Sequence, residues 1–298
     1  MSDLMLTEIL AELKRTNELL LEQARNTQLM ARWEADGVLR QLLKEPRYGF
    51  ARRLEHYAHK VFSENGEDGM IQEIFRRIGT TNKRFVEFGV SGGIECNTHL
   101  LLHFGWSGLW IEAQESWAQF IGRVFAGAIA DGRLTLRNDR VTKDNINDIL
   151  PSAGLHGEID LLSVDIDGDD YFVCDALTAV SPRVIVVEYN ASFPPPMKYL
   201  NQMSRPDGLC FGASLAAMAD MLFHKGYSLV GTDVCGVNAF FVRRDLVEDR
   251  FVQVDEIAAL YNPPRYGLSM GAPRGHYPPV GWNPGYDIEG HGSGGEPR

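Results

Sequence analysis

The segment that decides the fold is RFVEFGVSGGIECNTHLLLHFG, at residues 84–105. It starts as a short apolar strand, turns at a glycine-rich stretch and continues as an apolar helix. Gly89, Gly92 and Gly93 allow the backbone of this turn to approach a ligand closely. The N-terminus of the helix favours a negatively charged group, such as a carboxylate. Because the spacing G-x-x-G-G lacks the GxGxxG of NAD-binding turns, the segment indicates a different ligand.

Strands and helices alternate downstream of this segment. The expected strands are residues 84–88, 109–112, 133–136, 160–164, 184–188, 227–231 and 239–242. The expected helices are residues 95–104, 115–126, 143–150, 169–179 and 212–225. This order predicts an α/β fold, with a mostly parallel seven-stranded sheet and helices on both faces. The last two strands are too close in sequence for an intervening helix, so we expect them to pair antiparallel.

The N-terminal segment, residues 3 to about 36, has the pattern of one long helix. Asp3 is a capping residue at its start, and Asp36-Gly37 is a stop signal. Its apolar residues at helical spacing are Leu6, Ile9, Leu13 and Leu20, and as a heptad this stripe continues through Thr16, Gln23 and Thr27. These polar positions disfavour a long dimeric coiled coil. The helix therefore has two alternative roles, oligomerisation or packing of an amphipathic face on its own domain.

Residues 38–80 are predicted to be further helix. The segment SENGEDGMIQEIFRRIG has polar capping residues at Ser63 and Asn65, and Gly79 closes it. The C-terminal segment from Pro263 is rich in proline and glycine, which excludes regular helix or sheet there. We therefore divide the chain into an N-terminal helical extension at 1–45, a main domain at 46–260 and a tail at 261–298.

Composition excludes several classes of protein. The 298 residues carry a formal net charge of -11, which disfavours a general nucleic-acid binder. No apolar run approaches the roughly 20 residues of a membrane span, and the N-terminus lacks the pattern of a signal peptide. The four cysteines form no CxxC pair, so reduced thiols are expected rather than a disulfide framework or a zinc site. A soluble, cytoplasmic protein is the resulting expectation.

Acidic and polar residues end the second and third strands. Glu112 follows the strand in WSGLWIEAQ, and an acid in this place hydrogen-bonds a ribose diol in nucleotide-binding α/β folds. The third strand ends in Arg137-Asn138-Asp139, whose polar groups are within reach of a bound base. Together with the glycine-rich turn, these residues predict a nucleotide-type cofactor site.

Three motifs, FVEFGVSGGIECNT, GLWIE and DLLSVDIDGDDYFVCDAL, resemble motifs of class I S-adenosylmethionine (SAM) methyltransferases. The nearest type is the FkbM-like sugar and natural-product O-methyltransferases, and the resemblance covers about residues 63–244. It implies a Rossmann-like methyltransferase fold with SAM as the cofactor. It also implies that the segment SENGEDG closes over the cofactor. The cofactor-binding residues that it implies, together with the polar end of the third strand, are Glu87, Gly89, Gly92, Thr98, Glu112 and Asp139.

An acidic cluster follows the fourth strand, with Asp165, Asp167, Asp169 and Asp170 within six residues. The fifth strand is expected to bring Glu188 and Asn190 to the same edge of the sheet. Crowded carboxylates repel each other unless a proton or cation intervenes, and such oxygen ligands suit Mg²⁺. The expected metal ligands are Asp165, Glu188 and Asn190, with Asp167 as an alternative third ligand. Helix capping is the alternative role for Asp167, Asp169 and Asp170.

The expected activity is Mg²⁺-assisted O-methylation, with Asp165 and Asp167 as the catalytic residues. Asp167 would accept the proton of the acceptor hydroxyl, and His99, His103 and His224 are rivals for that role. The resemblance implies a sugar hydroxyl of a glycan or glycosylated natural product as the acceptor. Two alternatives stay open. One is a metal-independent methyltransferase with an Asp or His base, and the other is a non-catalytic cofactor-binding scaffold assembled through the N-terminal helix.

Overall fold

A central seven-stranded sheet organises the domain. The computed structural model describes residues 3–200 and 212–268. The strands are β1 (Arg84–Phe88), β2 (Ser107–Ile111), β3 (Leu134–Arg137), β4 (Gly157–Val164), β5 (Val180–Glu188), β6 (Tyr227–Thr232) and β7 (Asn238–Arg243). Their order in the sheet is β3-β2-β1-β4-β5-β7-β6. Strands β1 to β5 pair in parallel, whereas β7 is antiparallel to both β5 and β6.

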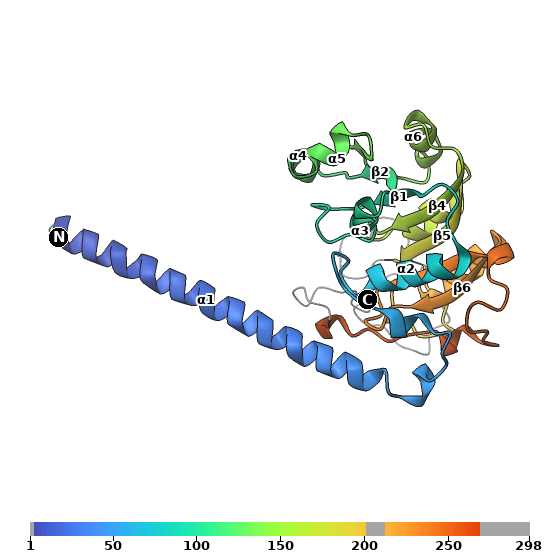
Figure 1. The fold of residues 1–298 in the computed structure, drawn as a ribbon, viewed down its shortest axis with the longest axis horizontal. Coiled ribbons are helices and arrows are strands. Elements are labelled where there is room, and N and C mark those ends of the chain that lie inside the picture. The colour runs from blue at the N-terminus through green and yellow to red at the C-terminus, as the bar shows by residue number, and fades with distance from the viewer. Residues whose placement is uncertain (1–2, 201–211, 269–298) are drawn as a thin grey trace, which may run out of the picture.

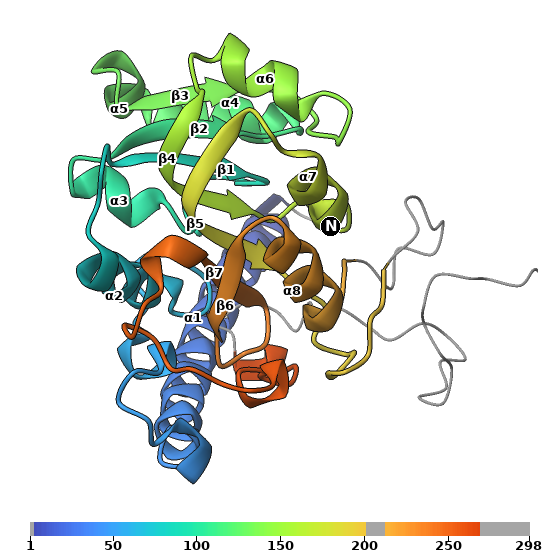
Figure 2. The same cartoon turned by 90° about the vertical axis from the view of Figure 1, so that its right-hand side faces the viewer.

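Helices cover both faces of this sheet (Figure 2). The α-helices are α1 (Asp3–Leu42), α2 (Glu67–Ile78), α3 (His99–His103), α4 (Glu115–Val124), α5 (Ala126–Ala130), α6 (Ile146–Ser152), α7 (Asp170–Ala176) and α8 (Leu215–His224). Short 3-10 helices lie at η1 (Pro46–Tyr48), η2 (Leu54–Tyr57), η3 (Arg244–Leu246), η4 (Ile257–Ala259) and η5 (Tyr266–Leu268). Helices α2 and α3 lie on one face of the sheet, and α6, α7 and α8 lie on the other.

Side-chain alternation along β1 explains the two layers. Phe85 packs into the core with Phe75 of α2, whereas Val86 packs into a separate core with Leu222 of α8. Both side chains are fully buried, as expected for a parallel strand with helices on its two faces. The predicted fold class is therefore confirmed: an α/β, mostly parallel seven-stranded sheet with helices on both faces and an N-terminal helical extension. The antiparallel pairing of the last two strands is also confirmed.

Two predictions in the N-terminal third are wrong. Helix α1 does not stop at Asp36-Gly37 but continues to Leu42. Gly37 is surrounded by open space, and an ion pair from Arg40 to Asp36 at 2.7 Å spans that turn. A glycine within a helix costs only about 1 kcal/mol, which a helix of this length tolerates.

The second error concerns the segment that follows α1. Residues 43–66 form turns, loops, η1 and η2 instead of further α-helix. Gly66, with a φ of +98°, is the N-cap of α2, and not Ser63 or Asn65. The expected end of α2 at Gly79 is confirmed, since this residue has a left-handed φ of +70° at the C-cap.

Helix α1 projects away from the domain (Figure 1). Near its base Ala35 is buried, and the helix contacts η5. Leu13 and Leu20, farther out, are 61% and 58% exposed. Packing along its own domain, one of the two roles inferred from the sequence, is therefore not observed for these described residues. Among the helices of the described chain, none has both the length and the apolarity that a membrane span needs.

Candidate functional site

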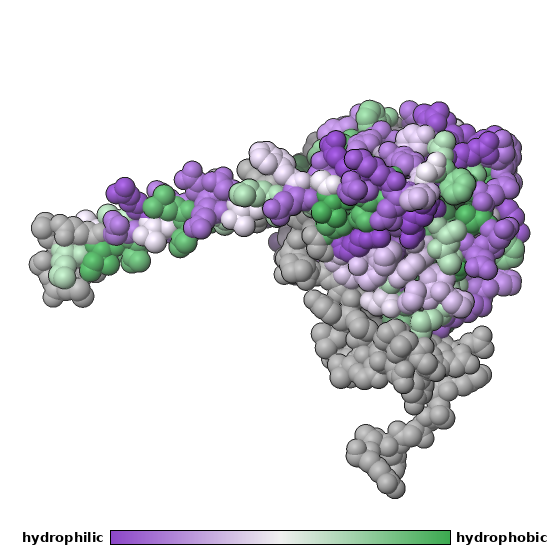
Figure 3. Space-filling model, turned by 90° about the horizontal axis from the view of Figure 1, so that it is seen from below, coloured by the Kyte–Doolittle hydropathy of each residue, from purple (hydrophilic) through white to green (hydrophobic). Residues whose placement is uncertain are grey.

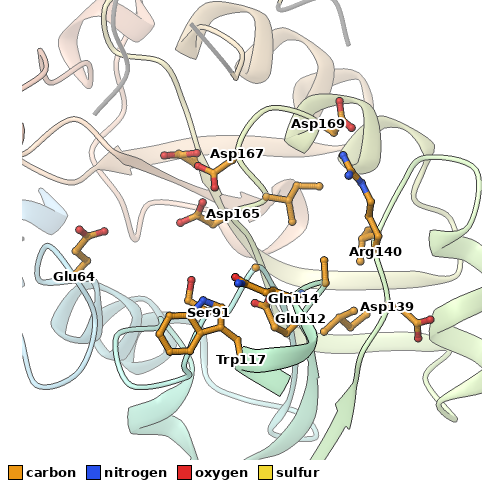
Figure 4. Close-up of a pocket in the computed structure, with 16 residues that line it drawn as sticks. Glu64, Ser91, Glu112, Gln114, Trp117, Asp139, Arg140, Asp165, Asp167 and Asp169 are labelled. Carbon is orange, nitrogen blue, oxygen red and sulfur yellow. The ribbon is translucent and has the colours of Figure 1, made fainter. Parts of the chain in front are cut away.

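A cavity of about 520 Å³ lies at the carboxyl edge of the parallel strands (Figure 4). Its walls come from the ends of β1, β2, β4 and β5, from the segment after β3, and from the loop before α2. The acidic residues in the lining are Glu64, Glu112, Asp139, Asp165, Asp167, Asp169 and Glu188. Arg140 is the only basic residue among the described residues that line it. The cavity therefore suits a ligand that carries positive charge or hydroxyl groups, and it disfavours anions.

Gly89 brings the ends of β1 and β4 together at the floor of the cavity. Its φ is +70°, and its N–H donates to the carbonyl of Ile111 at 3.1 Å. A Cβ built on Gly89 would lie 1.6 Å from the carbonyl oxygen of Asp165. Only glycine satisfies both the left-handed backbone and this close approach. The close approach that the structure shows at Gly89 is to the backbone of Asp165, and the approach of a ligand to this turn stays a prediction.

Gly92 contributes to the shape of the cavity indirectly. It does not line the cavity, but a Cβ there would lie 3.2 Å from the ring of Trp117, which does. Trp117 lies on α4 and is 40% exposed, so one side of its ring is open to a ligand. The position of this tryptophan depends on how α4 is rotated against the turn. No local pattern in the sequence therefore indicates it.

Glu87 and Thr98 lie beneath the glycine-rich turn and are not among the lining residues. The Glu87 carboxylate accepts hydrogen bonds from the Asn97 and Thr98 N–H groups and from the Thr98 and Ser163 hydroxyls. Burial raises the pKa of the Glu87 carboxyl, against the lowering effect of these bonds. The network fixes the start of α3 to β1. In this structure both residues shape the cavity from behind.

The acid that ends β2 lies where the sequence places it. Glu112 is 6% exposed, lines the cavity and accepts a hydrogen bond from the Gln114 N–H at 2.7 Å. Asn138 donates to the carbonyl of Glu112 at 2.8 Å, which ties the segment after β3 to the end of β2. Asp139 lines the same cavity and pairs with Arg137 at 2.9 Å. Glu112 and Asp139 therefore share one compartment, as expected for a nucleotide-type ligand.

Three carboxylates meet at the opposite end of the cavity. Oxygens of Asp165, Asp167 and Glu188 all lie within 4.8 Å of one another. Burial raises the pKa of the Asp165 carboxyl well above its ordinary value, and Glu188 and Asp170 raise it further. Burial likewise raises the pKa of the Glu188 carboxyl. Such crowding favours a bound proton or cation, and the donor set fits a hard divalent cation.

Asn190, the expected third ligand, is placed elsewhere. It is buried and does not line the cavity, and its side-chain oxygen accepts a hydrogen bond from the Ser192 N–H at 3.0 Å. Asp167, the alternative ligand, completes the group instead. Its left-handed φ of +55° follows from the tight turn after β4. That turn is closed by Asp170, which accepts the Ile166 and Gly168 N–H groups at 2.8 and 2.9 Å.

The loop before α2 forms a wall of the cavity through Glu64, which belongs to the segment SENGEDG but was not among the predicted site residues (Figure 4). The carboxylate of Asp68 accepts the N–H groups of Val61, Phe62 and Ser63, and the Ser63 hydroxyl accepts the Asp68 N–H. These reciprocal bonds fix the loop on the N-terminus of α2. This loop contains the segment SENGEDG, which the resemblance implies closes over the cofactor, and that closure stays a prediction. Ser91, Gln114 and Arg140 are further lining residues that were missed.

The candidate histidine bases lie outside the cavity lining. The ring of His99 stacks on Phe62, with 3.7 Å between the ring centroids, and His103 stacks in the same group. Burial lowers the pKa of His99. His224 lies at the end of α8 and its ring contacts the carbonyl of Asp220 at 2.8 Å. The histidines therefore support the loop or the surface, whereas Asp167 lines the cavity.

No protein-family model matches the chain, and no curated protein is significantly similar to it in sequence. Solved structures do resemble it, among them the following. The N-terminal domain of EvdMO1, in the presence of SAH and D-fucose, is 15% identical, with a TM-score of 0.41, covering 60% of this chain and 82% of that one. The glycopeptide N-methyltransferase MtfA with SAM is 13% identical, with a TM-score of 0.38 and coverages of 61% and 96%. The O-methyltransferase TomG from Streptomyces achromogenes with SAM is 17% identical, with a TM-score of 0.36 and coverages of 57% and 76%.

Proposed function

We propose that this protein is a SAM-dependent O-methyltransferase, assisted by Mg²⁺, that acts on a sugar hydroxyl of a glycan or glycosylated natural product. One observation carries the proposal. The close-approach glycine Gly89, the acid Glu112 and the carboxylate group of Asp165, Asp167 and Glu188 share one cavity of about 520 Å³. The sequence motifs that resemble those of class I methyltransferases supply all of these residues except Glu188, which follows the fifth strand.

The cavity fits the cofactor by charge and by hydrogen-bonding groups. SAM carries a sulfonium, an ammonium and a ribose diol, and the acidic lining is complementary to all three. SAM also carries a carboxylate, which would lie at the glycine-rich turn, where the sequence predicts a negatively charged group. Glu112 would accept hydrogen bonds from the ribose hydroxyls, and Gly89 would admit the methionine part close to the backbone. Glu87, Gly92 and Thr98 would keep the turn in shape. When bound, the cofactor supplies an electrophilic methyl group.

The carboxylates of Asp165, Asp167 and Glu188 would hold the metal. A divalent cation there would relieve their repulsion and lower the pKa of an acceptor hydroxyl. Asp167 is exposed at the turn and offers one oxygen to the metal, so its other oxygen would accept the proton that the hydroxyl releases as the new bond to the methyl group forms. The wall formed by Glu64 would limit the access of water to the reacting groups.

The electrostatics of the cavity select among acceptor classes. The acidic lining residues, with a single arginine among them, repel phosphate and carboxylate groups. An uncharged polyol meets no such penalty, and vicinal hydroxyls are oxygen ligands that suit a hard cation. These considerations support a sugar acceptor over a nucleic acid, in agreement with the net charge of -11.

The first test measures binding by calorimetry. We expect one S-adenosylhomocysteine per wild-type chain, and about 10- to 100-fold weaker binding for Glu112→Ala, because hydrogen bonds to a charged group are lost. Mg²⁺ alone should bind at one site in the wild type and not in Asp165→Asn. The exposed Asp148→Asn, on α6, is the matched control and should bind both ligands normally.

Each outcome assigns a function. Absence of S-adenosylhomocysteine binding in folded protein would overturn the proposal. Methylation that survives thorough chelation would replace it by the metal-independent alternative with Asp167 as base. Cofactor binding with no transfer to any sugar acceptor would favour the scaffold alternative.

A further inference from the structure

Helix α1 carries an apolar stripe that the described domain leaves exposed. The helix extends beyond the domain in Figure 1, and green, hydrophobic side chains recur along it in Figure 3. The members of the stripe with their exposed fractions are Ile9 at 42%, Leu10 at 53%, Leu13 at 61%, Leu20 at 58% and Leu21 at 53%. In the described chain the contacts of α1 concentrate on η5, next to its base. A helix in water is stabilised chiefly by packing of its amphipathic face, so this stripe requires a partner.

The spacing of the stripe is that of a coiled-coil seam. Leu10, Leu13, Asn17, Leu20 and Ala24 follow one another at intervals of three, four, three and four residues. This seam shares Leu13 and Leu20 with the heptad that spoke against a coiled coil, but it takes residues 10, 17 and 24 in place of 9, 16 and 23. Between Leu10 and Ala24 it contains a single polar residue. A lone buried asparagine in such a seam is the usual device that fixes register and strand number.

The charges on α1 exclude two other occupants. Residues 3–42 hold seven acidic and five basic side chains, intermingled along the helix. An anionic membrane surface and a nucleic acid would both require a positively charged face on the helix. Helix α1 has no such face, because acidic and basic residues are interspersed along it. A second copy of the same stripe meets no such conflict, because its apolar residues match in spacing.

The free part of α1 offers enough area for a reversible dimer. Its exposed apolar residues run from Met5 to Met30, about 38 Å of helix, because the base already packs on the domain at Ala35. A face about 10 Å wide gives roughly 400 Å² per chain and about 800 Å² for two chains, which is the size of a weak, dissociable interface. We propose that α1 pairs with α1 of a second copy as a parallel, in-register coiled coil through Leu10, Leu13, Asn17, Leu20 and Ala24. Parallel pairing places the two Asn17 amides opposite each other, whereas antiparallel pairing would face each with an apolar residue.

The test uses two neighbouring leucines of the full-length chain. Leu20 and Leu19 are both 58% exposed, but only Leu20 belongs to the seam. By sedimentation equilibrium, we expect the wild type to be a dimer. Leu20→Lys should weaken it about 100-fold or more, because two charges enter the seam. Leu19→Lys should leave the association unchanged.

The register is tested by cross-linking. Asn17→Cys should form an interchain disulfide under mild oxidation, whereas Glu22→Cys, on the opposite side of the helix, should not. The wild-type chain supplies the background from its natural cysteines. A wild-type monomer up to the solubility limit would overturn the proposal, and so would a dimer that Leu20→Lys does not weaken. The domain lies away from the seam. Unchanged thermal unfolding of the domain in both lysine variants would therefore show that a weaker dimer is not caused by loss of folding.

Discussion

Gly89 is the residue on which the shape of the cavity depends most directly. Gly89→Ala would add a Cβ 1.6 Å from the carbonyl oxygen of Asp165, besides the cost of about 1–2 kcal/mol for a left-handed non-glycine residue. Gly154 has a similar φ of +75° but nothing within 4 Å of its Cβ position. Gly154→Ala is therefore the control for the backbone cost alone. We expect urea unfolding to show that Gly89→Ala loses at least about 1 kcal/mol more unfolding free energy than the control. Equal losses in the two variants would mean that the ends of β1 and β4 can move apart without cost.

At the residue scale, the sequence predicts the site best where a strand ends. Glu112 and Asp165 both line the cavity because the carboxyl ends of parallel strands share one edge, and their roles stay predictions. Glu87 lies within β1 and shares a face with Phe85, so its side chain enters the layer beneath the turn. Trp117 could not be foreseen, because the rotation of α4 about its axis is set by packing and not by periodicity. Tertiary contacts therefore decide which residues of an assigned motif reach the cavity.

The loop before α2 is the element that depends on a single carboxylate. All three N–H groups of residues 61–63 donate to Asp68 at 2.7–2.8 Å. Asp68→Ala would release these N–H groups, so we expect faster amide hydrogen exchange in residues 61–64. We also expect cofactor binding to be about 10-fold weaker, because Glu64 would be displaced from the wall of the cavity. Asp249→Ala is the control, since Asp249 is 81% exposed and pairs with Arg52 at 3.4 Å. Unchanged exchange in Asp68→Ala would show that the loop is held by its other contacts.

At the element scale, regular segments were predictable and the connecting segment was not. All seven strands follow from short apolar runs between turn signals. Residues 43–66 were predicted to be helix but form loops, turns and short 3-10 helices. Tyr48 and Leu54 of this segment are fully buried, and Tyr48 hydrogen-bonds Asn262. The separation of 214 residues between these two partners explains why no local pattern indicates this contact.

At the scale of the whole molecule, buried carboxyl groups make stability depend on pH. Asp233 accepts the N–H groups of Cys235, Val237 and Asn238 in the turn between β6 and β7. Burial, together with the nearby Glu67, raises the pKa of Asp233 to about 7. Since this value lies above the ordinary pKa of about 3.9, the folded chain holds a proton that the unfolded chain has released. The contribution to stability is therefore complete below about pH 4 and is lost as the pH rises to about 7.

Glu67→Gln isolates this contribution. The neutral amide removes the neighbouring charge, so the pKa of Asp233 falls and the loss of unfolding free energy between about pH 4 and 7 becomes smaller than in the wild type. The substituted side chain can still accept the Asn65 N–H. In the wild type Glu67 also accepts the Asn238 side-chain N–H at 2.8 Å, and this contact is kept when the Asn238 amide reverses, so that its oxygen accepts from the new amide. Carboxyls with a lowered pKa, such as Glu73 hydrogen-bonded to Arg76, make the protein more stable as the pH rises. They contribute equally to the wild type and to Glu67→Gln. Urea unfolding at several pH values, with the exposed Glu12→Gln as control, measures the difference. If the unfolding free energies of Glu67→Gln and the wild type changed in parallel with pH, the charge of Glu67 would not act on Asp233.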